Sequence, residues 1–129
     1  MDYYTVSGII EKNDMRMWMV NPELMCSKHL LGEHVELHML AGCLQRGKNI
    51  DGFLKGGLVD PSLLHVRHEA LVREMEKRGY QHRSPIENCD YPLIKGDVDV
   101  QANVVELSSR CEDCRALFDE AGRTHVDSI

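Results

Sequence analysis

The stretch that most constrains the fold is residues 28–46, where apolar side chains recur at helical spacing with no interrupting proline. Gly47 follows directly and is suited to end such a helix. A second helical pattern, residues 63–78, comes after an Asp-Pro pair that supplies a cap and a first helical residue. Residues 97–120 predict a third helix. The sequence therefore predicts an all-α fold, a small single domain of about three main helices.

Shorter segments precede and connect these helices. Residues 1–14 are expected to form an N-terminal extension, either an edge strand around Thr5–Ile10 or a mobile arm, before a helical domain over 15–129. Residues 49–57 are spaced by glycines and have room for one short helical turn, and two prolines indicate a loop over 81–96.

Composition narrows the class of protein. Hydrophobic residues make up 43% of the chain, which argues against wholesale disorder. No apolar run approaches the roughly 18 to 20 residues of a membrane span, and the N-terminus lacks the features of a secretory signal. We therefore expect a soluble cytoplasmic protein with no membrane partner and with its five cysteines reduced.

The charge is unevenly distributed. A formal net charge of −6 argues against a general nucleic-acid binder. Lys and Arg nevertheless outnumber Asp and Glu over residues 46–83, whereas residues 84–129 are strongly acidic. A phosphate-binding surface is therefore expected in the middle third of the chain, assisted by Arg16 and Lys28 if they fold beside it.

One polar stripe stands out on the first predicted helix. At about 100° per residue, His29, Glu33 and Glu36 fall on the same face. Two carboxylates held together in a cleft would have their pKa values pushed apart, as general acid and base catalysis requires. A solvated helix face is the alternative explanation, because glutamate is common on helix surfaces.

The histidines offer a different chemistry. His34 and His38 are four residues apart on nearly the opposite side of the same helix, but the nearby glutamate is one place too late for an HExxH zinc motif. A metal-dependent hydrolase is therefore one alternative function, with further ligands available from Glu33, His65, His68 and His82. Structural or exposed histidines are the simpler interpretation.

Cys111 and Cys114 form a single CxxC pair. Zinc would need two more ligands, and a second CxxC is absent; Cys89 and His125 would complete a site only by coincidence of folding. A thioredoxin-like role would need a βαβ context that this sequence lacks. We interpret the pair as two half-buried cysteines on one helix face, with a structural zinc as the alternative. No cofactor and no metal are expected.

The order of these motifs resembles a known family. From residue 15 to residue 83 the chain looks like the pyrimidine-dimer DNA glycosylase family, the phage endonuclease V-like enzymes. The stretch His29–Leu37, HLLGEHVEL, resembles the family's HLxxExxEL string. The other resembling features are Met15-Arg16 ahead of this helix, Gly47-Lys48 with Phe53, and the segment from Arg67 to the Lys77-Arg78-Gly79-Tyr80 turn. The RCxxC segment near the C-terminus is similar to the phage and bacterial branch.

The resemblance implies DNA repair by an N-glycosylase with coupled lyase, or endonuclease, activity on duplex DNA. The family's nucleophile is an N-terminal α-amine, whose pKa near 8 leaves a neutral fraction at physiological pH. A chain beginning at Met15 would place that amine next to Arg16. The resemblance implies catalytic roles for Met15, Arg16 and Glu36, with Glu36 stabilising the cationic sugar and shuttling the proton. Substrate contacts are expected from His29, Glu33, Lys28, Lys48, Arg67 and Arg78.

Three departures from the family pattern support an alternative. The 14-residue extension precedes the family's usual start, Val35 replaces an arginine, and the C-terminal tail is acidic rather than aromatic and basic. The alternative is a non-catalytic relative that binds a nucleotide, another small phosphate-containing ligand or a protein partner. Nothing in the sequence predicts an oligomeric state.

Overall fold

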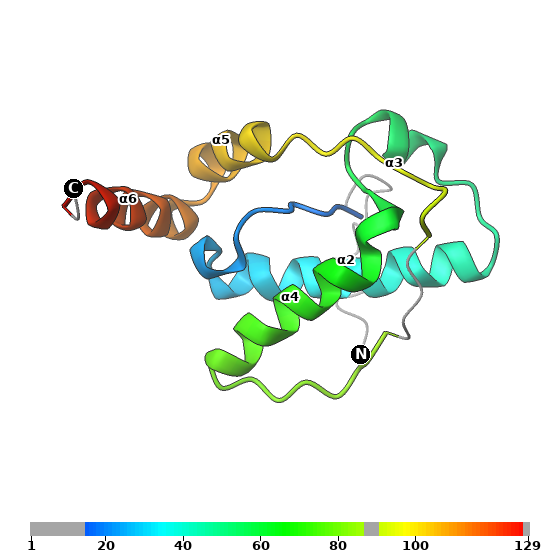
Figure 1. Ribbon diagram of the computed structural model, residues 1–129, viewed down its shortest axis with the longest axis horizontal. Helices are drawn as coiled ribbons and strands as arrows, with labels where there is room; N and C mark the ends of the chain where they lie inside the picture. Colours follow the sequence, from blue (N-terminus) through cyan, green and yellow to red (C-terminus); the bar gives the residue numbers. More distant parts are fainter. Residues whose placement is uncertain (1–14, 87–90, 128–129) are drawn as a thin grey trace.

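The computed structural model describes residues 15–86 and 91–127, and every regular element within them is helical. The predicted all-α fold is confirmed (Figure 1). Two long helices, α2 (Ser27–Gln45) and α4 (Leu64–Lys77), pack across one another. The remaining elements are η2 (Pro22–Leu24), α3 (Asp51–Lys55), η3 (Pro61–Leu63), α5 (Val100–Arg110) and α6 (Glu112–Asp127).

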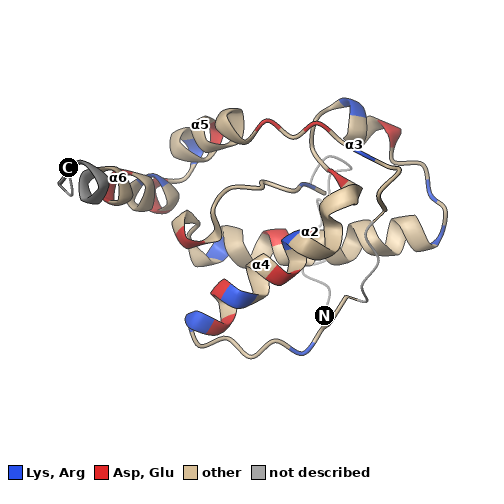
Figure 2. Ribbon diagram, viewed as in Figure 1, with Lys and Arg blue, Asp and Glu red and all other residues tan. Residues whose placement is uncertain are grey.

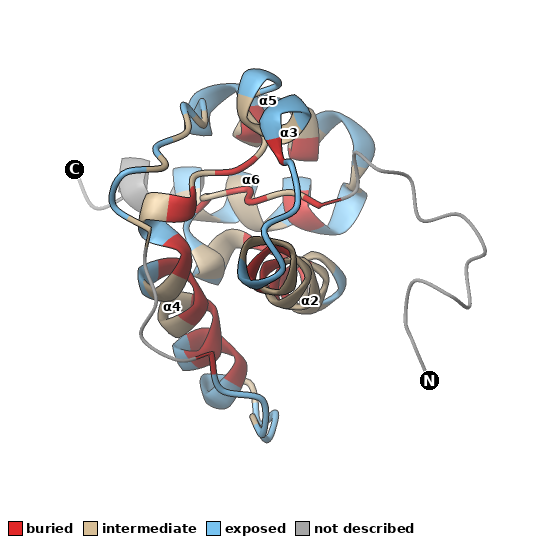
Figure 3. Ribbon diagram, turned by 90° about the vertical axis from the view of Figure 1, so that its right-hand side faces the viewer, coloured by how far each residue is buried: buried red, intermediate tan, exposed pale blue. Residues whose placement is uncertain are grey.

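The core lies mainly between α2 and α4. Leu30 and Leu37 of α2 and Leu64 and Leu71 of α4 are completely buried. Figure 3 shows the buried residues of α4 along the side that faces α2. Each such leucine contributes about 1.5–3 kcal/mol by leaving water, so this contact fixes which faces of α2 remain available for a site.

Residues 15–20 form an extended strap that runs through the core rather than over the surface. Met17, Trp18 and Val20 are all buried. The amide of Met17 donates to the carbonyl of Leu58 at 2.7 Å. The segment just before α2 is therefore an internal part of the domain.

The predicted boundaries of the first two helices are confirmed within one or two residues. Gly47 ends α2 with a φ of 67°, a conformation that glycine adopts without steric cost. Asp60 caps the start of the second helical segment, because its carboxylate accepts from the amide of Ser62 at 3.2 Å. The one short turn expected over residues 49–57 is α3.

The prediction of one helix over residues 97–120 was wrong. The structure has two helices there, α5 and α6, separated at Cys111. Cys111 has φ −135° and ψ 108°, which is extended backbone and breaks the helical path. Helical periodicity continues across this residue in the sequence, so the pattern alone did not indicate the break.

Other predictions concern the connecting segments. The loop predicted over residues 81–96 is confirmed for the parts described, 81–86 and 91–96, which contain neither helix nor strand. The edge strand considered around Thr5–Ile10 lies outside the described residues. None of the helices in the described chain is both long and apolar enough to cross a bilayer.

Gly96 allows an unusually close approach of two backbone segments. Its amide donates to the Asp60 carboxylate at 3.1 Å, and a Cβ atom added to it would collide with the carbonyl group of Val59. We expect Gly96→Ala to lower the free energy of unfolding by about 1–3 kcal/mol, as overpacking does. Urea denaturation measures this loss. Gly52→Ala is the control, because an added Cβ on α3 meets nothing within 4 Å; equal effects of the two changes would contradict the prediction.

Candidate functional site

The polar stripe of α2 divides into two different environments. Glu33 is fully buried, and both its oxygens accept from Arg67 of α4, at 2.7 Å from Nε and 2.8 Å from Nη2. Arg67 is only 5% exposed. The two charges therefore compensate each other inside the core, and neither group is presented to a ligand.

Glu36 lies one turn further along and is half-buried. A Cβ added to Gly32 would come within 3.8 Å of the Glu36 carboxylate, so this carboxylate lies beside a helix position without a side chain. A glycine within a helix costs roughly 1 kcal/mol relative to alanine. The missing methyl group leaves space next to the one carboxylate of the stripe that solvent can reach.

Arg16, at the start of the strap, is engaged by α5. Its guanidinium donates to the two oxygens of Glu106 at 2.8 and 2.9 Å and to Oδ1 of Asn103 at 2.6 Å. The same group stacks over Trp18, 3.7 Å from the ring centroid. The Arg16 hydrogen bond, which outweighs burial, holds the pKa of Glu106 below its usual range. The hydrogen bonds of Arg16 thus connect the strap to α5.

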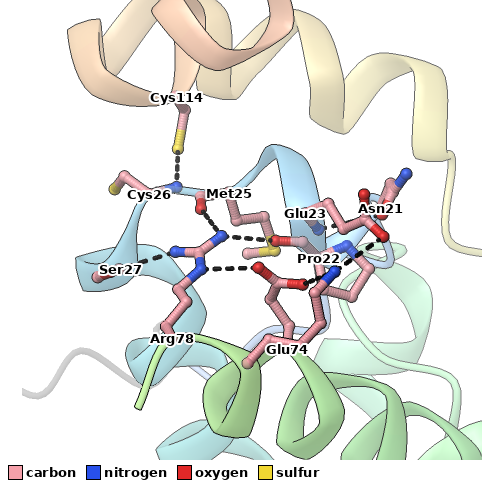
Figure 4. Close-up of polar contacts among 10 residues, drawn as sticks. Asn21, Pro22, Glu23, Met25, Cys26, Ser27, Glu74, Arg78 and Cys114 are labelled. Carbon is pink, nitrogen blue, oxygen red and sulfur yellow. Dashed lines mark hydrogen bonds and ion pairs between the residues drawn. The ribbon is translucent and has the colours of Figure 1, made fainter. Parts of the chain in front are cut away.

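Arg78 fastens the end of α4 to the chain just before α2 (Figure 4). It donates to the carbonyl groups of Pro22 and Met25, at 3.1 and 2.7 Å, and to Ser27 Oγ at 3.2 Å. Its Nε donates to Glu74 at 2.8 Å. All three nitrogens of the guanidinium are therefore used inside the protein.

The two lysines predicted to contact substrate are placed differently. Lys28 and Lys48 are exposed. Figure 2 shows basic residues in the loop between α2 and α3 and at the end of α4, while acidic residues precede α5. The two lysines are thus exposed to solvent, whereas the predicted arginines, Arg16, Arg67 and Arg78, are engaged internally.

A cluster of sulfur and nitrogen atoms lies where the first turn of α2 meets the junction of α5 and α6; we call Cys26, His29, Cys111 and Cys114 the cysteine cluster. Burial raises the pKa of the Cys114 thiol to about 12. Burial opposes ionisation of Cys111 as well, but hydrogen bonds from Cys114 hold its pKa below the usual thiol value. Burial, then the nearby charges of Arg110 and Lys28, lower the pKa of His29.

A second cluster, the histidine cluster, consists of His34 and His38 from α2, His68 from α4 and His82 from the following loop. His34 and His68 are buried. Burial and the three neighbouring rings lower the pKa of His34 to about 3, so its imidazole is neutral at physiological pH. This cluster lies on the opposite flank of α2 from Glu36, as the helical spacing predicted.

The cysteine cluster includes a residue that the sequence analysis missed. Cys26 was not considered as a ligand, whereas Cys89 and His125 were; Cys89 and the side chain of His125 lie outside the described part of the chain. The available signal was Cys26-x-x-His29, a pair with the same spacing as Cys111-x-x-Cys114. The Cys26–His29 pair was missed because only a second pair of cysteines at this spacing was considered.

Comparison with models of known protein families identifies a family for this chain. A family model described as pyrimidine dimer DNA glycosylase matches residues 15–88, more than half of the chain. The matched part begins with the strap and includes α2, α3 and α4, while α5 and α6 follow it. No curated protein and no solved structure gives a significant match.

The Glu33–Arg67 pair yields a stability prediction. Arg67→Met leaves a buried carboxylate without its partner, so we expect a loss of about 3–5 kcal/mol in the free energy of unfolding, measured by urea titration. Arg73→Met is the matched control, because Arg73 is exposed on the same helix and should change stability by no more than about 0.5 kcal/mol. Adding Glu33→Leu to Arg67→Met should restore much of the loss. If Arg67→Met is as stable as Arg73→Met, the Glu33–Arg67 ion pair does not contribute to stability as proposed.

Proposed function

Because the chain belongs to the pyrimidine dimer DNA glycosylase family, we propose that it is an N-glycosylase that removes pyrimidine dimers or another modified base from duplex DNA. We extend this to cleavage of the resulting abasic strand. The match includes both helices that build the core and the whole polar stripe, so the proposal concerns the part of the chain in which the candidate site lies.

The proposed reaction begins with a neutral amine attacking C1′ of the damaged nucleotide. The glycosidic C1′–N bond breaks and the base leaves with its electron pair. The attacking nitrogen then loses a proton, and the C1′–O4′ bond opens as the nitrogen lone pair forms the imine, with O4′ taking up a proton. Removal of a C2′ proton then expels the 3′ phosphate by β-elimination. The amine of Met15, in a chain that starts at that residue, would be the nucleophile. The target nucleotide must be extruded from the helix to be reached.

Glu36 is the residue we assign to the sugar. The observation that carries this assignment is the contrast in exposure between the two glutamates: Glu33 is fully buried, whereas Glu36 is half-buried and its carboxylate lies 3.8 Å from the position a Cβ on Gly32 would take. A carboxylate in such a partly desolvated position stabilises developing positive charge on the sugar ring and accepts and returns a proton.

The basic residues divide by their surroundings. We assign phosphate contacts to the exposed Lys28 and Lys48. Arg16 would act as a positioning residue for the strap, through its contacts with Glu106 and Asn103. His29 has Nδ1 turned toward sulfur atoms, which leaves only Nε2 for a nucleotide. Arg67 and Arg78 would support the site by holding α4 against α2.

The internal pairing of these arginines is also the observation that favours a second function. A relative that binds a nucleotide or a small phosphate-containing ligand without catalysis needs fewer free cations than a duplex binder. The two are separated by titrating the protein with duplex DNA at increasing salt, because each released counterion makes affinity for duplex fall with salt concentration.

Catalysis by Glu36 is tested on UV-irradiated and abasic duplexes. We expect Glu36→Gln to lower the cleavage rate by about 10²- to 10⁴-fold, the usual contribution of a positioned proton-transfer group. Gly32→Ala, which places a methyl group beside the carboxylate, should also slow cleavage. Glu76→Gln is the control, since Glu76 is exposed on α4. Cleavage by Glu36→Gln at the parent rate would refute the assignment.

The nucleophile is tested by borohydride trapping. A chain beginning at Met15 and the full chain are each incubated with damaged duplex and reductant, and covalent adducts are resolved by electrophoresis. An adduct with the shorter chain, lost on blocking its α-amine, is the expected result. Absence of adduct and of strand cleavage for both chains would overturn the glycosylase proposal as a whole.

A further inference from the structure

We propose that the cysteine cluster binds a structural zinc ion that fastens the start of α2 to the α5–α6 pair. The donor atoms come from two places far apart in the chain: Cys26 and His29 at the start of α2, and Cys111 and Cys114 at the break between α5 and α6 and in the first turn of α6. Three sulfur atoms and one imidazole nitrogen form a ligand set found in structural zinc sites.

The separations between donors match tetrahedral coordination. Cys26 Sγ lies 3.7 Å from Cys111 Sγ and 3.3 Å from His29 Nδ1, and Cys114 Sγ lies 3.7 Å from that nitrogen. With Zn–S near 2.3 Å and Zn–N near 2.0 Å, a tetrahedron places two sulfurs about 3.8 Å apart and a sulfur about 3.5 Å from a nitrogen. The four donors are therefore already spaced around a point that a zinc ion would fill.

The backbone around the cluster also suits thiolate ligands. The amide of Cys26 donates to Cys114 Sγ at 3.3 Å, which Figure 4 shows, and the amide of Cys114 donates to Cys111 Sγ at 3.3 Å. Amide hydrogen bonds of this kind stabilise metal-bound sulfur. Cys26 and Cys111 both stand immediately before a helix, where the helix dipole favours negative charge.

The charge of the loaded site is balanced locally. Binding converts three thiols to thiolates and releases their protons to solvent, so the zinc with its ligands carries a net charge of −1. Arg110 and Lys28 act electrostatically on His29 and supply positive charge nearby. The extended backbone at Cys111, between α5 and α6, allows the sulfur of Cys111 to face that of Cys26.

The zinc site is tested on the full chain without an affinity tag, purified without chelator. Elemental analysis should find an equivalent of zinc that Cys114→Ser lacks and Cys43→Ser retains, because Cys43 lies outside the cluster. Replacement by Co²⁺ should give the absorption of tetrahedral cobalt with a thiolate charge-transfer band. If Cys114→Ser does not fold, a mercurial reagent added to the folded parent should release zinc to a chromophoric chelator as thiols react. Metal content equal in both variants, or cobalt without the thiolate band, would overturn the site.

The histidine cluster carries a second inference on separate grounds: we infer that it binds a first-row divalent metal, with Zn²⁺ the best fit. The Nε2 atoms of His34, His38, His68 and His82 are all buried, and each is without a hydrogen-bond partner among the described residues. A buried polar atom without a hydrogen-bond partner destabilises the folded state, because it has lost its hydrogen bonds to water. Four such atoms that converge within 4.8 Å are explained together by one ion at their centre.

Ring geometry gives the same answer. Five separations between ring centroids in the cluster run from 4.8 Å for His34–His38 to 5.2 Å for His38–His68. Imidazoles bound through Nε2 at about 2.0 Å in a tetrahedron have centroids about 5.2 Å apart. Nδ1 of His68 lies 2.8 Å from the Glu69 carboxylate, the kind of contact that orients a metal-binding imidazole. Four protein ligands leave a tetrahedral ion without an open position, so the site would tie α2, α4 and the following loop together rather than activate water.

The same purified chain tests this second site. His38→Gln should lose one equivalent of metal while keeping the thiolate-to-cobalt band, and His65→Gln should keep both equivalents because His65 is outside the cluster. After dialysis against chelator, adding Zn²⁺ should raise the unfolding temperature of the parent, with a contribution from each site. Cys114→Ser should keep only the contribution of the histidine site, and His38→Gln should keep only that of the cysteine site. A His38→Gln protein with unchanged metal content would refute the histidine site. Both tests read metal directly, so neither outcome depends on DNA cleavage.

Discussion

The buried ion pair between Glu33 and Arg67 is the interaction on which the arrangement of this protein depends. It joins the two long helices where both are fully covered, and two hydrogen bonds fix their relative position. A charge in this place is tolerated only when its partner is present, so helices packed in another register would be strongly disfavoured. With α2 held in this way, Glu36 lies on one flank of the helix and His34 and His38 lie on the other.

Local patterns in the sequence were enough to predict the central helices. The Asp60 cap and the terminal Gly47 were identified because each depends on residues next to it in the chain. The division of residues 97–120 into two helices was not visible in the local pattern; the break falls at Cys111, whose sulfur lies 3.7 Å from that of Cys26, 85 residues earlier. The engagement of Arg16 by Glu106, 90 residues away, is of the same kind. Side chains paired over such distances leave no trace in periodicity.

The candidate sites show the same division. The shared face of His29, Glu33 and Glu36 followed from helical geometry, but the different environments of the two glutamates required knowledge of Arg67. Likewise, the spacing of His34 and His38 was visible, while the addition of His68 and His82 depended on the packing of α4 and the course of its following loop. A chain with only 5% aromatic residues has few large side chains to fill a core. Hydrogen bonds and ion pairs between distant segments therefore contribute part of the stabilisation that large apolar side chains would otherwise provide.

The strap over residues 15–20 has a consequence for synthesis on the ribosome. Trp18 is buried, and its carbonyl accepts from Asn103 of α5 at 2.8 Å. Translation proceeds at about 5–20 residues per second, so α2 and α4 emerge seconds before the helix that completes the cover over this segment. During that interval the indole of Trp18, which is synthesised 85 residues before Asn103, has no finished pocket. The nascent protein would thus expose the apolar side chain of Trp18 until α5 has been released from the ribosome.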